Sequence, residues 1–122
     1  MRPAPALAHP VVLKSFGQLL RAQVRDFDVA ARLGGEEFAI LLPQTTAEAA
    51  AVVAARTRDT LAASPMAVSD DATVRLSASF GIAESSPGLT TDELLRRADD
   101  ALYAAKRAGK NRYVVDATAG VS

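Results

Sequence analysis

The amino-acid sequence predicts a domain of the α/β or α+β class, in which helices cover a sheet. Stretches with apolar residues at helical spacing alternate along the chain with short stretches of strand character. Glycine, proline and threonine signals for turns and helix starts separate these stretches. Hydrophobic residues make up 49% of the 122 residues, which is sufficient to form the core of one domain.

The first predicted elements are a helix and a hairpin. Apolar residues recur at helical spacing between about 11 and 25, which predicts a helix there. Two short strands are predicted at 29–33 and 36–42, on either side of Gly34-Gly35. Because the favoured hairpin turns need positive φ angles at their central residues, this glycine pair indicates a tight hairpin.

A second helix and a strand follow the hairpin. Residues 45–48 match a capping box and open an alanine-rich helix that reaches about residue 63, where Ser64-Pro65 ends it. Apolar and polar residues then alternate from Val74 towards Ala83, which is typical of a strand buried on one face.

The last predicted elements are a helix and a short strand. A second capping box at residues 90–93 opens the helix, and Gly109 is a suitable residue to stop it. Residues 113–115 form the final strand. The element order is therefore helix, hairpin, helix, strand, helix, strand, and residues 11–116 are expected to form one domain.

The two ends of the chain are expected to lie outside this domain. Residues 1–10 contain three prolines and predict a disordered or extended arm, and residues 117–122 predict a tail. No stretch resembles a secretory signal or is long and apolar enough to span a bilayer. The expected location is therefore the cytoplasm.

Composition excludes several classes of function. The 14 basic and 14 acidic residues balance, which argues against a nucleic-acid-binding protein, and aromatic residues make up only 5%. The chain has no cysteine and one histidine, so a zinc site is not expected. A bound metal would have carboxylate ligands, and such ligands favour hard ions such as Mg²⁺.

The residues with the strongest chemical signal lie at the hairpin, where Glu36 and Glu37 follow Gly34 and Gly35. Adjacent side chains at the start of a strand point to opposite faces. One carboxylate could therefore bind a divalent ion while the other approaches a reacting hydroxyl, and the glycines would let a phosphate approach the backbone. An ordinary hairpin with solvated glutamates has the same sequence.

Several motifs together resemble the GGDEF family, the bacterial diguanylate cyclases. Residues 34–38 match its signature in the Gly-Gly-Glu-Glu-Phe form, and Arg25 and Asp28 have the spacing of its RxxD inhibitory site. Residues 79–83 are similar to its Ser-x-Gly-[Ile/Val]-Ala strand. Residues 98–111 are similar to the Ala-Asp-x-Ala-Leu-Tyr-x-Ala-Lys end of its last helix and the loop after it. The resemblance extends over about residues 11–115.

The resemblance implies a fold and an activity. The fold is that of the nucleotidyl cyclases, a central, mainly antiparallel sheet flanked by helices. Family members condense two GTP molecules into cyclic di-GMP, each domain of a pair holding one GTP. Metal ions, Mg²⁺ or Mn²⁺, bind the phosphates and stabilise the developing charge. The implied partners are therefore GTP, cyclic di-GMP and a second copy of the chain.

The resemblance also implies roles for individual residues. Glu37 would be a metal ligand, and Glu36 would help to activate the 3′-hydroxyl and contact metal. Gly34 and Gly35 would lie against the nucleotide. The basic residues Lys106 and Lys110 would contact the terminal phosphates. A site for the product would consist of three residues, Arg25, Asp28 and Arg56.

Each of these residues also has an ordinary structural interpretation. Lys106 and Lys110 lie near a helix C-terminus, where cations complement the helix dipole. Arg25 and Asp28 could be a simple pair three residues apart, and Arg56 a solvated helix residue. Asp99 and Asp100 are interpreted as charges of a helix surface or a structural pair, and not as metal ligands.

The sequence departs from the family at its front. The family's first strand, Asp-x-Asp-x-Phe-Lys-x-x-Asn-Asp, is absent, and with it a metal-binding aspartate and contacts to guanine. A shortened natural protein, a misassigned start codon and a cloned fragment would each account for this. Another chain, the N-terminal arm, or nothing would take the place of the missing strand, and an oligomer with exchanged segments is one expectation.

Three functions remain open from the sequence. The first is a diguanylate cyclase domain that is catalytically impaired and binds Mg²⁺ weakly if at all. The second is a non-catalytic module that binds cyclic di-GMP through Arg25, Asp28 and Arg56. The third is a domain that acts only in dimerisation.

Overall fold

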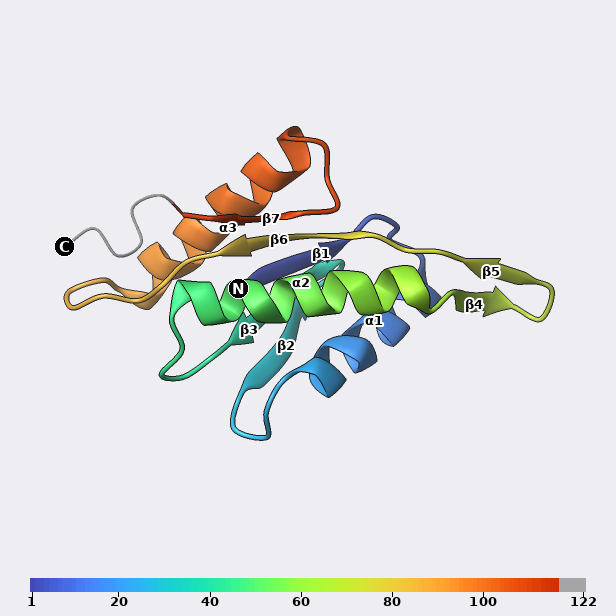
Figure 1. The fold of residues 1–122 in the computed structure, drawn as a ribbon, viewed down its shortest axis with the longest axis horizontal. Coiled ribbons are helices and arrows are strands. Elements are labelled where there is room, and N and C mark those ends of the chain that lie inside the picture. Colours follow the sequence, from blue (N-terminus) through green and yellow to red (C-terminus); the bar gives the residue numbers. More distant parts are fainter. Residues whose placement is uncertain (117–122) are drawn as a thin grey trace.

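The computed structural model of the chain describes residues 1–116. Figure 1 shows the order and arrangement of its elements. Their bounds are β1 Arg2–Pro5, α1 Pro10–Gln23, β2 Val29–Gly34, β3 Glu37–Leu41, α2 Ala47–Ala63, β4 Met66–Ser69, β5 Ala72–Val74, β6 Ala78–Ile82, α3 Thr91–Arg107 and β7 Tyr113–Val115. None of the helices within residues 1–116 combines the length and the apolar character needed to cross a membrane.

Strand β6 is the centre of the sheet. It pairs antiparallel with β1 on one side and parallel with β7 on the other. The hairpin of β2 and β3 is antiparallel and is attached to β1 through Met1 and Ile40, which exchange two backbone hydrogen bonds of 2.8 and 2.9 Å. The predicted mainly antiparallel sheet flanked by helices is thereby confirmed.

The N-terminal arm contributes a central strand. The sequence left open whether another chain, this arm or nothing takes the place of the missing strand, and in the structure it is the arm. Residues 2–5 form β1, which lies between β3 and β6. The chain therefore lacks the family's first-strand motif but has a strand beside β6. Because this strand comes from the same chain, an exchange of segments between copies is not needed to complete the sheet.

The two prolines of β1 are compatible with its position because of the strand's register. Arg2 and Ala4 pair with β6, and the amide of Ala6 continues that ladder by donating to the carbonyl of Ser77 at 3.0 Å. In a strand, alternate residues direct their backbone groups to opposite neighbours. Pro3 and Pro5 therefore face β3, where they have no N–H to donate, and the ladder to β3 is limited to Met1.

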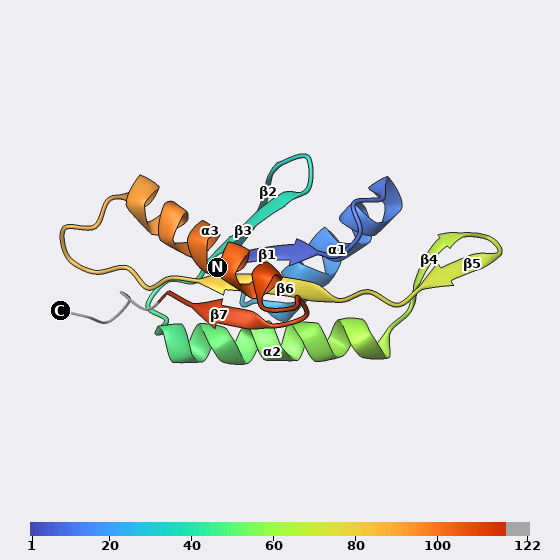
Figure 2. The same ribbon diagram turned by 90° about the horizontal axis from the view of Figure 1, so that it is seen from above.

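The sheet is covered on both faces. Apolar side chains of α1 and α2 form one core with β3 and with Ala78, Phe80 and Ile82 of β6. Helix α3 packs against the opposite face, and Figure 2 shows α2 and α3 on opposite sides of β6 and β7. All five residues of β6 are buried. The prediction of a strand buried on one face is therefore wrong, because α3 covers the second face.

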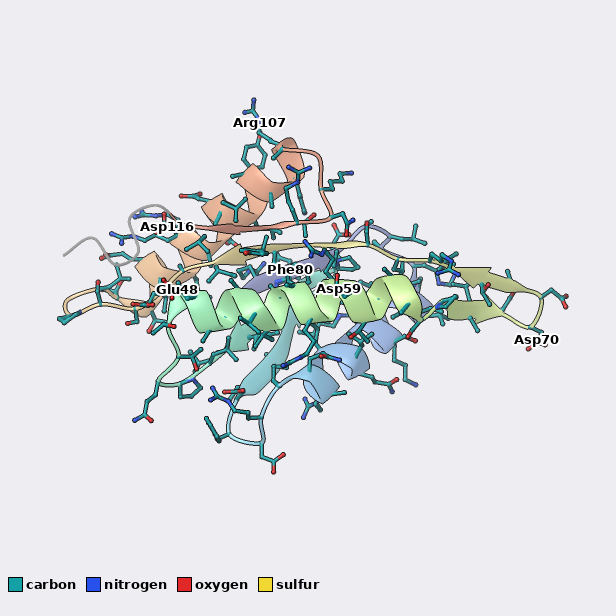
Figure 3. All side chains as sticks on the ribbon, in the orientation of Figure 1. Glu48, Asp59, Asp70, Phe80, Arg107 and Asp116 are labelled. Carbon is teal, nitrogen blue, oxygen red and sulfur yellow. The ribbon has the colours of Figure 1, made fainter. Side chains whose placement is uncertain are left out.

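The predicted strand from 74 to 83 is in fact two strands. β5 ends at Val74, and β6 begins at Ala78. β5 pairs with β4 in a hairpin for which the sequence predicted no element before Val74, and this hairpin projects from the body of the molecule in Figure 1. Figure 3 labels Asp70, at the tip of this hairpin, and Phe80 of β6, which is fully buried.

The helix starts agree with their predicted capping signals to within one residue. The hydroxyl of Thr90 accepts from the amide of Glu93 at 3.1 Å, as a capping box requires. At α2 the cap is Thr46, which accepts from Ala49 at 3.1 Å. The predicted cap, Thr45, is thereby left free to take part in another contact described below. The predicted tail, residues 117–122, lies outside the described residues.

Candidate functional site

The hairpin that carries the two glutamates is shaped by its glycines. Gly35 has a φ of +50° and Gly34 a φ of +152°, both in the region that favours glycine, and no atom lies within 4 Å of a Cβ built on either residue. The side chain of Arg32 fixes the turn, since its Nε donates to the carbonyl of Gly35 at 2.7 Å. The predicted Gly-Gly hairpin is confirmed, with a bulge between Arg32 and Gly34.

Both glutamates line one small cavity of about 230 Å³. The expectation that their side chains point to opposite faces assumed two strand residues, whereas Glu36 belongs to the turn and only Glu37 belongs to β3. Lys106 of α3 lines the same cavity. The structure therefore brings together three of the predicted active-site residues.

The remaining predicted active-site residues are placed differently. Lys110 is not among the residues that line this cavity. It follows the end of α3 with a φ of 64°, and its amide donates to the carbonyl of Ala105 at 3.0 Å. Gly34 and Gly35 also do not line the cavity, although the space around both is open.

Two residues of this cavity were not expected to belong to the site. Arg2 of β1 is 5% exposed, and its Nε lies 2.7 Å from Oδ1 of Asp99 on α3. An Nη2 atom of the same guanidinium lies 3.9 Å from Oε1 of Glu37. Asp99, interpreted from the sequence as a surface charge or a structural pair, is therefore the ion-pair partner of a buried arginine.

A second cavity, of about 490 Å³, contains the three predicted product-site residues. Arg25 and Asp28 lie in the segment between α1 and β2, and Arg56 lies on α2. The guanidinium of Arg25 donates from Nε and Nη2 to the two carboxylate oxygens of Asp28, at 3.1 and 3.2 Å. The Asp28 carboxylate also accepts from the amide of Arg25 at 2.8 Å.

Further contacts hold the two arginines in place. Nη2 of Arg25 donates to the hydroxyl of Thr45 at 2.7 Å, and its guanidinium carbon lies 4.4 Å from the ring centroid of Phe27. Nε of Arg56 donates to the side-chain oxygen of Gln23 at 2.9 Å, and Nη2 donates to the backbone oxygen of the same residue. Both guanidinium groups are thus anchored through Nε and Nη2.

The electrostatics of this cavity follow from the Arg25–Asp28 pair. The side chain of Asp28 is 1% exposed, and its hydrogen bonds to Arg25 lower the pKa of its carboxyl below the ordinary value of 3.8. Because the pKa is lowered, this pair stabilises the fold at pH values above the ordinary pKa of aspartate. That contribution is lost as the pH falls through the lowered pKa.

Comparison with known protein families identifies the family of this chain. The sequence model of the family described as diguanylate cyclase, GGDEF domain, matches residues 10–112. The chain belongs to the GGDEF family. It is 39% identical over 109 residues to the diguanylate cyclase DgcP of Pseudomonas aeruginosa, an alignment that covers 89% of this chain and 16% of DgcP.

Solved structures of GGDEF domains share this fold. The GGDEF domain of YfiN (TpbB) from Pseudomonas aeruginosa superimposes with a TM-score of 0.85 and 30% identity, covering 94% of this chain and 79% of that domain. The GGDEF domain of DgcB from Caulobacter crescentus, solved in complex with c-di-GMP, gives a TM-score of 0.72 and 27% identity, covering 94% of this chain and 75% of that one. The chain spans 16% to 28% of the length of the curated relatives it matches.

The carboxylates of this GGDEF domain do not fit a divalent metal ion. Diguanylate cyclases of the family generally depend on Mg²⁺, and Mg²⁺ requires near-octahedral coordination by oxygen atoms. Within residues 1–116, no three histidine, aspartate or glutamate side chains gather closely enough to hold a metal. The group beside Glu37 is instead the cation of Arg2, at 3.9 Å.

Proposed function

We propose that this GGDEF domain binds cyclic di-GMP in the cavity lined by Arg25, Asp28 and Arg56, and that it forms little or none of this nucleotide from GTP. The observation that supports binding is that residues from two separate segments of the sequence, 25–28 and 56, line one cavity. Its volume of about 490 Å³ lies in the range of small-molecule sites.

The chemistry of the cavity suits a dianionic nucleotide. Each arginine uses Nε and Nη2 for contacts within the protein, and neither Nη1 group donates a hydrogen bond to the described residues. A guanidinium can donate two hydrogen bonds to a phosphate or to the acceptor edge of guanine. Asp28 positions Arg25 for this contact, and a carboxylate also accepts from guanine N–H groups. The ligand therefore need not break the Arg25–Asp28 pair.

The binding experiment is calorimetric titration of the chain with cyclic di-GMP and with GTP. Wild type should bind cyclic di-GMP and not GTP, and added salt should weaken the binding. Replacing Arg25 by alanine removes a charge-assisted contact and should weaken the affinity about tenfold to a hundredfold.

The matched control for this titration is Arg21→Ala, which removes an arginine of α1 that does not line this cavity. It should bind cyclic di-GMP like the wild type. Equal binding by wild type, Arg25→Ala and Asp28→Ala, or binding by none of them at micromolar concentrations, would refute the assignment and favour a simple surface pair at this position.

Turnover of GTP is expected to be undetectable. The cavity at the hairpin holds Glu36, Glu37 and Lys106, but the family's metal-binding aspartate and its guanine contacts are absent from the sequence. Incubation with GTP and Mg²⁺, followed by nucleotide chromatography, measures the product. If wild type makes cyclic di-GMP and Glu37→Gln does not, the chain is an active cyclase and this part of the proposal is wrong.

A cytoplasmic location and self-association are also part of this proposal. GTP and cyclic di-GMP are the nucleotides implied for the site, and both are found inside bacterial cells. Val29, Leu33 and Leu41 of the β2–β3 hairpin are each more than half exposed, and β2 is an edge strand. An apolar sheet edge of this kind is a surface on which a second copy could pack.

A further inference from the structure

Arg2 is a buried arginine at a cavity whose other charged residues are the carboxylates Glu36, Glu37 and Asp99 and the exposed Lys106. Its side chain is 6% exposed, whereas its partners Asp99 and Glu37 are 53% and 66% exposed. Its Nε lies 2.7 Å from Asp99, but the N–H is not directed at that oxygen. Among the residues described, this Nε is the one buried side-chain polar atom that has no hydrogen-bond partner. The guanidinium is thus held by charge and packing.

The register of the sheet places Arg2 at this position. Arg2 pairs with Gly81 of β6, and the side chain of Arg2 therefore lies on the face that α3 covers. Because Gly81 has no side chain, the backbone of α3 approaches the sheet directly at Ala98 and Leu102. Asp99, which follows Ala98, is in this way brought over Arg2.

We propose that Arg2 is the resident cation of the Glu37–Asp99 carboxylate pair and takes the place that a divalent metal ion would need. The formal charges of Arg2, Glu37 and Asp99 sum to −1, and those of Glu37 and Asp99 alone sum to −2. A guanidinium within 4 Å of both carboxylates repels a second cation from them. This inference does not rest on the binding of cyclic di-GMP, which concerns the other cavity.

The test is the binding of Mn²⁺ to the 122-residue chain, followed by the electron paramagnetic resonance signal of free Mn²⁺. Wild type should show no saturable site in the micromolar range. Arg2→Gln retains a long polar side chain and removes the charge, and it should bind one Mn²⁺ at least about tenfold more tightly than wild type. Adding Glu37→Gln to that variant should abolish the gain.

Two controls separate this effect from net charge and from misfolding. Lys14→Gln removes one positive charge from the exposed face of α1 and should leave the affinity for Mn²⁺ unchanged. Arg2→Lys retains the charge and should bind Mn²⁺ no better than wild type. Equal Mn²⁺ affinity in wild type and Arg2→Gln, or a folded Arg2→Gln that gains no site, overturns the proposal.

Amide spectra of the wild-type chain test the proposal without any variant. Mn²⁺ bound between the carboxylates would broaden the amide signals of Glu37 and Asp99 before all others. Selective broadening of these signals at substoichiometric Mn²⁺ overturns the proposal, and uniform weak broadening supports it. This measurement decides the question even if Arg2→Gln does not fold.

Discussion

Replacing Gly81 by alanine is expected to destabilise this domain strongly. A Cβ at this position would lie 2.0 Å from the carbonyl oxygen of Ala98 and 2.3 Å from the amide nitrogen of Leu102. Both are backbone atoms of α3, so no side-chain rotation relieves the contact, and the helix must move away from β6. We expect the free energy of unfolding to fall by at least about 3 kcal/mol, which is a large share of the stability of a small domain.

Urea denaturation followed by circular dichroism measures this loss. The control is Gly17→Ala in α1, where the added Cβ would meet only the ring of Phe38, at 3.4 Å. Alanine also favours helix over glycine by about 1 kcal/mol, so the free energy of unfolding should change little or rise. If Gly81→Ala unfolds at the same urea concentration as wild type, α3 does not pack on β6 as closely as described.

The elements that the sequence predicted are those with local signals. The hairpin follows from Gly34-Gly35, and α3 follows from its capping threonine and its apolar stripe, which ends before Gly109. In each case the residues that determine the conformation lie within the element or at its ends. The bounds of these elements therefore agree with the prediction to within about two residues.

The elements that the sequence did not predict depend on distant partners. β1 contains Pro3 and Pro5, which locally indicate a disordered or extended arm. It is a strand because its other residues pair with β6, about 75 positions away. Likewise, β6 has the alternating pattern of a strand with one exposed face. Nothing near it in the sequence reveals that α3 covers that face.

The same distinction applies to the two candidate sites. Arg25 and Asp28 are three residues apart, and a pair between them was one of the two interpretations that the spacing offered. Arg2 and Asp99 are almost a hundred residues apart, and their ion pair depends on the register of β1 and on the close approach of α3 to Gly81. Local pattern could not identify Arg2, because its role exists only in the folded sheet.

In the 122-residue chain, the α-amino group of Met1 is a buried ionisable group beside β1. The α-amino group of Met1 donates to the carbonyl of Ile40 at 2.9 Å. Burial, and to a lesser extent the charge of Arg2, lowers the pKa of this amino group from 8.0 to about 6. In the unfolded chain the amino group is hydrated and retains its ordinary pKa. Folding therefore releases a proton between pH 6 and 8.

The stability of the 122-residue chain with a free α-amino group should consequently rise between pH 6 and 8. In this window the unfolded state binds more protons than the folded state, so each increase in pH favours folding. The contribution of this amino group to the free energy of unfolding is complete above about pH 8. It falls by about 2–3 kcal/mol as the pH is lowered to 6. Urea denaturation at several pH values measures the change.

His9→Asn, which removes the one imidazole and retains a good helix cap, should show the same rise. Acetylation of the α-amino group removes the titrating proton and should abolish the rise. An unchanged pH profile after acetylation would show that the amino terminus is not buried against β3.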